Sequence, residues 1–326
     1  MRNRRSLCRR ALALLLAFLF LFWCSACGKG NPSRGQAGKS IVCVSFPEYD
    51  WVRSILGDNP GGWEAVLLLD KGVDLHSFQP DVQDILKVTS CDVLIHTGGP
   101  SSGWITEALK EADRWEGTEI SLLAVLGDAV RTEEQTEGME GEEEEEAEPD
   151  EHVWLSLRNA EVLVSEISGV LQQKDPSHAE TYRANAQAYL EKLAALDAAY
   201  QKTSGEAAVH TILVADRFPF RYLTDDYEIS YYAAFPGCSA ETEASFKTVA
   251  FLSEKVQELS LPAILKIEGS DGRIAEIVSE SAGNPELKIL TLDSMQSVTA
   301  EKIRDGETYL GIMEKNLETL KEAMNP

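Results

Sequence analysis

The sequence has few basic residues for its length, and outside the N-terminus they form no dense basic patch. It contains 30 Lys and Arg against 54 Asp and Glu over 326 residues, a formal net charge of -24. Nucleic-acid binding requires Lys and Arg to neutralise phosphates, so this balance argues against a nucleic-acid partner. An acidic surface is compatible with cation binding, although acidity alone usually reflects only a solvated surface.

Several common catalytic motifs are missing as well. The chain has no Gly-x-Ser-x-Gly nucleophile elbow, no phosphate-binding loop, no dinucleotide fingerprint and no His-Glu-x-x-His helix. No nucleophile therefore stands out, and nothing indicates a nucleotide cofactor.

Cysteines are scarce in the body of the chain. After Cys27 only Cys43, Cys91 and Cys238 remain, an odd number with no short paired spacing. Because Cys43 and Cys91 lie in apolar, strand-like runs, we predict that both are buried thiols. A disulfide between these two cysteines is the alternative.

One apolar run near the N-terminus follows a basic segment. Residues 11–23 supply about thirteen apolar residues, too few for a comfortable transmembrane span but suited to a signal peptide. Small residues precede Cys27 as in a bacterial lipobox, except that Cys24 stands at the usual leucine position. We expect a signal peptide over 1–26, lipidation of Cys27 and a polar tether over 27–39, with plain secretion or an uncleaved anchor as the alternative. Several acyl chains would make a stable membrane anchor.

The rest of the chain alternates short apolar, β-branched runs with helical patterns, which is typical of parallel sheets in α/β domains. Residues 179–203 carry an unbroken helical pattern without Gly or Pro, long for a globular helix and suited to a rigid rod. A closing amphipathic helix is predicted over 307–324. The predicted strands are residues 40–46, 65–69, 92–96, 119–125, 211–215, 230–235, 263–267 and 288–292.

An acidic insert interrupts this alternation over residues 131–150 and includes five consecutive glutamates from Glu142 to Glu146. Such a block repels itself and has nothing to bury, so we expect a mobile loop. It is either a solvated spacer or a loop that gathers cations, because it ends directly before His152.

Two stretches place a histidine two residues after an aspartate. They are Asp74-Leu75-His76 and Asp150-Glu151-His152. A neutral imidazole held by a nearby carboxylate is the commonest way to present a nitrogen to a transition metal. We therefore predict His76 and His152 as metal ligands.

The other three histidines lack this context. His96 ends an apolar run, and we predict a packed core side chain hydrogen-bonded to backbone. His178 and His210 lie in or beside exposed helical segments without a carboxylate partner, so neither is expected to bind metal.

Acidic residues follow three predicted strands of the second half, namely Asp216, Glu268 and Asp293. In open α/β sheets, ligands bind beyond the carboxyl ends of strands. Two histidines with carboxylates suit a metal-binding transport protein, but also a hydrolytic metal centre with an open water position. Both classes stay open at this point.

A set of ordered motifs resembles the zinc/manganese substrate-binding lipoproteins of metal ABC transporters (cluster A-I). Residues 74–80 (DLHSFQP) resemble the family's Asp-Pro-His-Ser-Phe-Glu-Pro motif, and residues 150–160 resemble its second histidine motif. The ordered set is specific and covers nearly all of the mature chain, although each motif alone is weak. Further matches are Phe46-Pro47-Glu48-Tyr49, Gly98-Gly99 with Trp104, Thr308-Tyr309-Leu310 and Asn316-Leu317.

The resemblance implies an α/β fold of two lobes, each a mainly parallel sheet flanked by helices, joined by one long rigid helix with the metal between the lobes. On this basis we predict an N-terminal lobe over 40–178, a connecting helix over 179–204 and a C-terminal lobe over 205–326.

The resemblance also implies ligands from the second lobe. Members have a His or Glu after that lobe's first strand, whereas this chain has no histidine there. Counting back from Tyr227 along the family's motif, Asp216 takes the ligand position if this chain has one inserted residue, and we predict it as the third ligand. Without an insertion the position is Arg217, which cannot bind a cation. The alternative role of Asp216 is a carboxylate paired with Arg217 or Arg221. Asp293 matches the family's closing aspartate and is predicted as the fourth ligand, while Glu268 is predicted to support the ligands, or alternatively to bind the metal itself.

The implied function is capture of one Zn²⁺ or Mn²⁺ as the transported ligand, outside the membrane, and delivery to the permease of a metal ABC transporter. Two nitrogens and two carboxylates suit tetrahedral zinc, and also manganese if the carboxylates bind bidentately; zinc is favoured. We expect a monomer that is not an enzyme and binds no nucleic acid. A metallohydrolase and a surface adhesin on the same fold are the alternatives.

Overall fold

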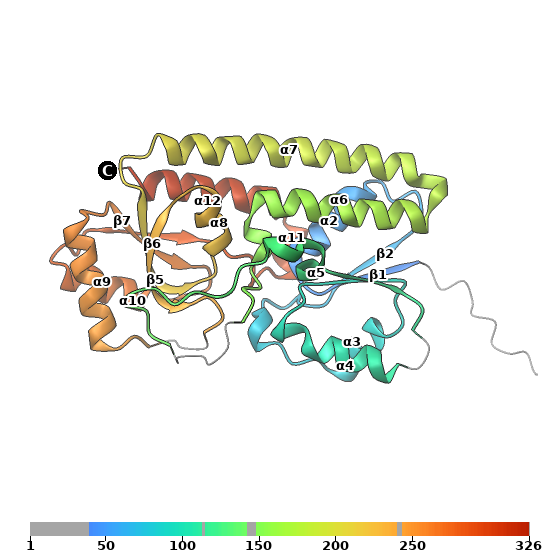
Figure 1. The fold of residues 1–326 in the computed structure, drawn as a ribbon, viewed down its shortest axis with the longest axis horizontal. Helices are drawn as coiled ribbons and strands as arrows, with labels where there is room; N and C mark the ends of the chain where they lie inside the picture. The colour runs from blue at the N-terminus through green and yellow to red at the C-terminus, as the bar shows by residue number, and fades with distance from the viewer. Residues whose placement is uncertain (1–38, 113–114, 142–147, 240–242, 326) are drawn as a thin grey trace, which may run out of the picture. The chain divides into compact units, whose positions relative to one another are not determined.

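The computed structural model describes residues 39–112, 115–141, 148–239 and 243–325. Within these ranges the chain forms two four-stranded parallel sheets flanked by helices (Figure 1). The predicted signal peptide, Cys27 and the run Glu142–Glu146 lie outside the described residues. No helix in the described part of the chain has the length and apolar character needed to cross a membrane.

The first lobe is built on a sheet with the strand order β2-β1-β3-β4. Its central strands, β1 and β3, are buried apart from Ser40 at the start of β1, as their continuous apolar runs require. Figure 1 shows α3 and α4 on one side of this sheet and α2 and α6 on the other. The elements are β1 (Ser40–Cys43), α2 (Phe46–Leu56), β2 (Glu64–Leu67), α3 (Val82–Val88), β3 (Val93–His96), α4 (Gly103–Glu111), β4 (Thr118–Ser121), α5 (Leu122–Leu126) and α6 (Leu157–Lys174).

The second lobe repeats this plan with the strand order β6-β5-β7-β8. Alternate residues of β5 serve two cores: Leu213 packs with the α9 and α10 side, while Ile212 and Val214 join the core that continues through the rest of the molecule. The elements are β5 (Thr211–Phe218), α8 (Arg221–Asp226), β6 (Ser230–Pro236), α9 (Phe246–Glu258), β7 (Ala263–Ile267), α10 (Arg273–Ser281), β8 (Lys288–Leu292), α11 (Ala300–Arg304) and α12 (Tyr309–Ala323).

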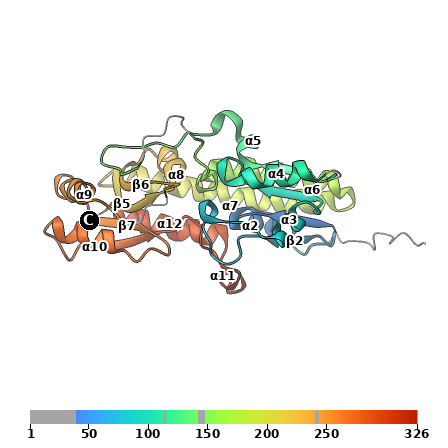
Figure 2. The same cartoon turned by 90° about the horizontal axis from the view of Figure 1, so that it is seen from below.

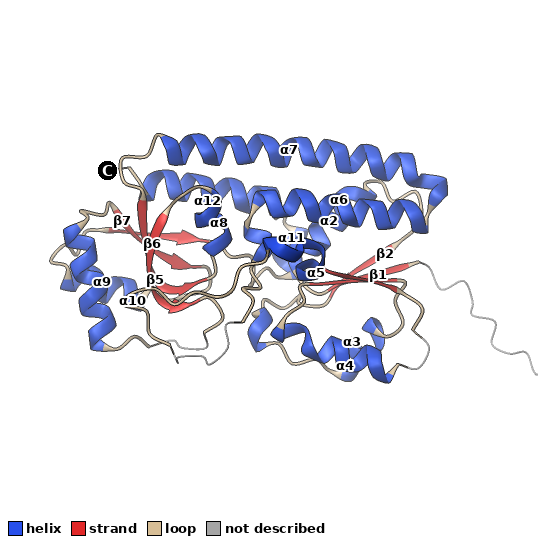
Figure 3. Ribbon diagram, in the orientation of Figure 1, coloured by secondary structure: helices blue, strands red, loops and turns tan. Residues whose placement is uncertain are grey.

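One long helix, α7 (Ala179–Gly205), runs along both lobes and packs against α2, α6 and α12 (Figure 3). Its buried residues include Tyr182, Leu193 and Tyr200, and the Tyr200 hydroxyl donates to the Met313 carbonyl of α12 at 2.6 Å. The predicted two-lobe α/β fold with a long connecting helix is confirmed.

Direct hydrogen bonds also join the lobes next to the predicted site. The indole of Trp154 donates to the Ser294 carbonyl at 2.9 Å, and the Tyr309 hydroxyl donates to the Trp154 carbonyl at 2.7 Å. All three side chains are fully buried or nearly so. The segment after His152 is therefore fixed against both lobes.

Three predicted strands end earlier than their apolar runs suggest, among them the run 65–69, which is strand only to Leu67. The run 119–125 is strand only to Ser121, whose hydroxyl accepts from the Ala124 amide and starts α5. The run 40–46 is strand only to Cys43, because the Glu48 carboxylate accepts from the Val44 and Ser45 amides and α2 begins there. At β4 and β1, a local hydrogen bond between a side chain and the backbone ends the strand in favour of a helix.

The described part of the acidic insert lies across the second lobe (Figure 2). We call its described residues, 131–141 and 148–150, the acidic strap. The Glu140 carboxylate accepts from the Ser245 amide at 2.7 Å and the Thr248 hydroxyl at 3.0 Å, and its amide donates to the Ala234 carbonyl. The described part is thus docked on the lobe and does not fit the predicted mobile loop.

Candidate metal centre

His76 lies in a short 3-10 turn, Leu75–Ser77, that follows β2. The Asp74 carboxylate accepts from the His76 amide at 2.9 Å and so fixes this turn. The sequence suggested that Asp74 holds the His76 imidazole, but Asp74 bonds the backbone amide instead. The His76 Nδ1 instead lies 3.0 Å from the Ser101 hydroxyl and 3.2 Å from a Glu151 carboxylate oxygen.

His152 follows the acidic strap by two residues, and its backbone is fixed in the same way as that of His76. The Asp150 carboxylate accepts from the His152 amide at 2.9 Å and also lies 2.8 Å from its Nδ1. His152 is completely buried. The spacing of an aspartate two residues before the histidine thus sets the backbone in both motifs, and at His152 it also orients the ring.

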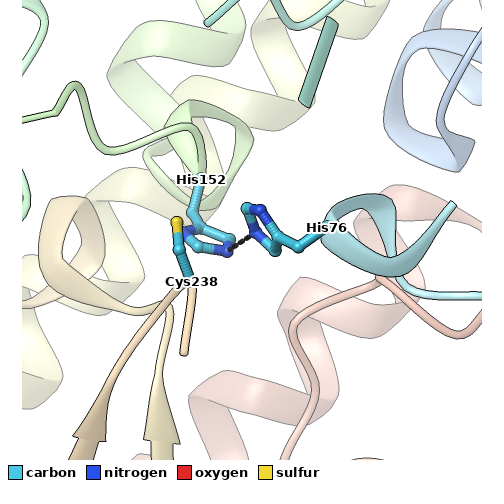
Figure 4. A group of neighbouring side chains, drawn as sticks. All are labelled: His76, His152 and Cys238. Carbon is cyan, nitrogen blue, oxygen red and sulfur yellow. Dashed lines mark hydrogen bonds between the residues drawn. The ribbon is translucent and has the colours of Figure 1, made fainter. Parts of the chain in front are cut away.

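The two imidazoles face one another through their Nε2 atoms, 3.1 Å apart (Figure 4). Carboxylates only accept, so His152 Nδ1 donates to Asp150; the Ser101 hydroxyl donates to Glu151 and therefore accepts from His76 Nδ1. Both neutral rings then present an Nε2 lone pair to the same point. Two nitrogen ligands of a tetrahedral zinc ion, with Zn–N near 2.0–2.1 Å, are about 3.3 Å apart. The pair is therefore arranged to share a metal ion, or a proton in its absence.

Glu151 and Ser101 were not recognised as site residues from the sequence, although the Gly98-Gly99 motif signals them. Gly99 has a φ of 70°, and a Cβ there would lie 2.5 Å from a Glu151 carboxylate oxygen. The Ser101 amide donates to the same oxygen at 2.9 Å. The glycine thus leaves room for the carboxylate that orients His76.

Electrostatics favour a shared cation at this position. Burial lowers the pKa of His152, but the charge of Asp150 and the hydrogen bond to it outweigh burial and raise the pKa above its usual value. Burial raises the pKa of Asp74, but the charge of Arg217 and the contact with His76 outweigh burial. The net pKa is therefore below its usual value, and this carboxyl stays ionised. The centre therefore carries negative charge around two nitrogen donors.

Cys238, in the turn after β6, comes close to both histidines (Figure 4). One ligand atom from each of His76, His152 and Cys238 lies within 4.8 Å of the other two. Among the described His, Cys, Asp and Glu residues, these three form the cluster that could hold a metal ion. Burial is the main cause of a raised pKa at the Cys238 thiol, and the negative charge of Glu133 adds to it. The spacing of the cysteines gave no signal for this residue. Its place just after the predicted strand 230–235 is a signal that the sequence interpretation did not use.

Asp216 does not belong to that group. It lies inside β5, within the irregularity between Val214 and Arg217, and not after the strand as predicted. Its carboxylate accepts from the Arg217 amide at 2.9 Å and lines a cavity of about 700 Å³ together with Asp74 and Glu268. The Arg217 side chain pairs with Asp74 across the lobes at 2.8 Å.

Asp293 and Glu268 lie beside one another in the second lobe. The Asp293 carboxylate accepts from the Met295 amide at 2.7 Å, and its peptide group is held by Asn316. Glu268 accepts from the Ser294 amide and hydroxyl, both at 2.7 Å. Burial, with the neighbouring Asp293, raises the pKa of Glu268 to about 7. Neither carboxylate belongs to the group around His76 and His152.

Comparison with known proteins identifies the family. Residues 41–323 match the model described as "Zinc-uptake complex component A periplasmic". The chain belongs to this family. It is 30% identical over 317 residues to the zinc-binding lipoprotein AdcA of Streptococcus pneumoniae, with 96% of this chain and 61% of AdcA covered. The chain therefore spans about three fifths of the length of that relative.

One further relative matches over nearly its whole length, and one solved structure matches over most of this chain. The metal ABC transporter substrate-binding lipoprotein ScbA of Streptococcus cristatus is 28% identical over 325 residues, covering 98% of this chain and 99% of ScbA. The crystal structure of the Zn(II)-bound ZnuA-like domain of S. pneumoniae AdcA superimposes with a TM-score of 0.70 at 28% identity, covering 87% of this chain and 98% of that domain. The predicted resemblance is confirmed.

Other side chains of this zinc-uptake family member differ from expectation in detail. His96 pairs with Glu119 at 2.8 Å and not with backbone, and His178 does have a carboxylate partner, Asp175, at 2.9 Å. Cys43 and Cys91 are buried free thiols as predicted, without a disulfide.

Proposed function

We propose that this protein is an extracytoplasmic solute-binding lipoprotein. It captures one divalent transition metal ion, zinc in preference to manganese, between its lobes and delivers the ion to the permease of a metal ABC transporter. The observation that carries the proposal is the pair of Nε2 atoms of His76 and His152, 3.1 Å apart and each backed by a carboxylate on the opposite side of its ring. The printed names of the relatives, zinc-binding and metal ABC transporter substrate-binding lipoproteins, support it.

Capture follows from the arrangement of the side chains. His152 donates to Asp150, and His76 donates to the Ser101 hydroxyl that Glu151 holds; these hydrogen bonds fix the rings and increase the basicity of their free nitrogens. An arriving ion replaces the proton shared by the two rings, so binding releases a proton and weakens as the pH falls. Because His152 is fully buried and its ring holds the ion from inside, release requires that the lobes separate locally, which is the step we assign to docking on the permease.

The nitrogen donors favour zinc. Imidazole suits zinc, whereas manganese prefers carboxylate and water oxygens. Asp216 and Asp293, with Glu268 in support, remain our proposed ligands from the second lobe; each is an acid near the carboxyl end of a strand in that lobe. They would enter the coordination shell as the lobes adjust around the ion.

The membrane anchor is part of the proposal. The basic and apolar N-terminal segment, the small residues before Cys27 and the lipoprotein names of the relatives support lipidation of Cys27 and attachment to the outer face of the bacterial cell membrane. We further propose that the protein acts as a monomer. The same comparisons favour a transport role over a metallohydrolase or an adhesin.

The test is zinc titration by calorimetry of the protein without its signal peptide. The wild type should bind one zinc ion tightly, and the variant His76→Ala/His152→Ala should not bind it. His210→Ala is the matched control, because this exposed histidine lies away from the centre. A double variant that titrates like the wild type would show that the site is misplaced.

A further inference from the structure

The turn that carries Cys238 is held by three hydrogen bonds. The Cys238 amide donates to a Glu133 carboxylate oxygen at 2.8 Å, which ties the turn after β6 to the acidic strap. The next residue is held from β5, since the Arg217 guanidinium donates to the Ser239 carbonyl at 3.5 Å. The turn itself is closed by the Ser239 amide, which donates to the Pro236 carbonyl. These contacts keep the cysteine beside the two imidazoles.

Gly237 shows how tightly this turn is pressed against the centre. A Cβ at this position would lie 2.9 Å from His152 Cε1 and 2.9 Å from the Phe218 carbonyl. Real Cβ atoms do not approach so closely, so only glycine lets the turn run along the edge of the His152 ring. The close approach brings the following sulfur to within 4.8 Å of a ligand nitrogen on each histidine (Figure 4).

We infer that Cys238 supplies a thiolate sulfur as a third ligand to the ion held by His76 and His152. The inference rests on the proposed function and specifies the chemistry of that site. The three donors come from the loop after β2, the segment after the acidic strap and the turn after β6. The sulfur thus joins the second lobe to the ion, and one of the carboxylates proposed above, Asp216 or Asp293, completes a tetrahedral shell.

The required chemistry is a simple exchange. The S–H bond breaks heterolytically, its electron pair stays on sulfur and forms the metal–sulfur bond, and the proton passes to solvent. In a tetrahedral shell with Zn–S near 2.3 Å and Zn–N near 2.05 Å, nitrogen and sulfur are about 3.6 Å apart. The sulfur therefore has to approach by at most about 1.2 Å, within reach of a side-chain rotation or a small closure of the lobes.

A thiolate changes which cations the site prefers. Soft sulfur ligands select zinc and similar ions, while manganese prefers oxygen. The inference thus predicts a centre that binds Zn²⁺, Co²⁺ and Cd²⁺ and discriminates strongly against Mn²⁺.

The experiment uses Co²⁺ and Zn²⁺ as probes on the purified lipoprotein without its signal peptide, kept reduced by a phosphine. Bound Co²⁺ should give the intense near-ultraviolet absorption of a thiolate–cobalt bond in the wild type and in Cys91→Ala. Cys238→Ser should lose this absorption and bind zinc at least about tenfold more weakly, the minimum that loss of even a supporting partner usually costs. X-ray absorption of the zinc-loaded wild type should show one sulfur neighbour at about 2.3 Å.

The outcomes separate the inference from the proposed function. If zinc binds with dependence on His76 and His152 but without a sulfur neighbour, and Cys238→Ser binds it as the wild type does, the cysteine is not a ligand although the transport proposal stands. If the wild type binds no zinc at all, the proposed function fails and the inference fails with it. Because the absorption measurement needs no variant, poor folding of Cys238→Ser would not leave the question open.

Discussion

Gly99→Ala should weaken zinc binding without touching a ligand. A Cβ at Gly99 would lie 2.5 Å from a Glu151 carboxylate oxygen and 3.0 Å from its Cγ, so the carboxylate must move. Moving it removes the acceptor of the Ser101 amide and the carboxylate beside His76 Nδ1. Loss of such an orienting partner typically lowers metal affinity by about 10–100-fold, or about 1.4–2.7 kcal/mol.

The same substitution also strains the backbone, and a control variant isolates that effect. Gly99 has φ 70° and ψ -166°, a conformation that costs a residue with a Cβ about 1–3 kcal/mol. Gly127 is similarly strained for other residues, with φ 50° and ψ -116°, but a Cβ there would meet nothing within 4 Å. Gly127→Ala should therefore lower the melting temperature and leave zinc affinity unchanged.

The assay is competition for zinc against a fluorescent chelator, with thermal unfolding of the metal-free protein measured in parallel. We expect both variants to melt earlier than the wild type and only Gly99→Ala to lose affinity. If Gly99→Ala melts earlier but binds zinc as tightly as the wild type, then Glu151 does not orient His76 and the reasoning is wrong.

Three further predictions concern protonation and metal loading. Burial raises the pKa of Glu48 to about 8, so the folded state binds its proton more tightly than the unfolded chain and stability should fall by a few kcal/mol as the pH rises from about 4.5 to 8. Glu48→Gln keeps an acceptor for the Val44 and Ser45 amides and should flatten this dependence in urea unfolding at several pH values; an unchanged profile would exclude Glu48 as its source. Asp150→Asn removes the carboxylate that raises the pKa of His152 and orients its ring, so zinc binding should weaken about 10–100-fold at neutral pH. Wild-type affinity of this variant in the competition assay would contradict the role of Asp150. Zinc at a hundredfold excess over its Kd should raise the free energy of unfolding by about 2.7 kcal/mol, and a chelator should reverse the gain; no shift in the calorimetric melting temperature would argue against binding to the folded state.

The fold could be predicted from the sequence to a large extent because its strands are continuous apolar runs and its longest helix has no breaker. The strands Ala263–Ile267 and Lys288–Leu292 have the predicted bounds, and α7 differs only at its C-terminal end. The errors at β1 and β4 occur where a side chain bonds the backbone at a helix start, Glu48 at α2 and Ser121 at α5, a local hydrogen bond that overrides an apolar run.

The site could be predicted only in part. The two aspartate-x-histidine motifs give His76 and His152 because the aspartate fixes the local backbone. Partners contributed from distant segments have no such signature: Ser101 reaches His76 from another loop, and Cys238 reaches it from the other lobe. The docking of the acidic strap likewise depends on Glu140 meeting the start of α9, a contact between segments more than one hundred residues apart.

The most direct measurement is a crystal structure of the zinc-loaded protein with anomalous diffraction recorded at the zinc absorption edge. The account predicts a single strong peak between the Nε2 atoms of His76 and His152, about 2.0–2.1 Å from each. A peak elsewhere, with these two nitrogens still in direct contact, would contradict it.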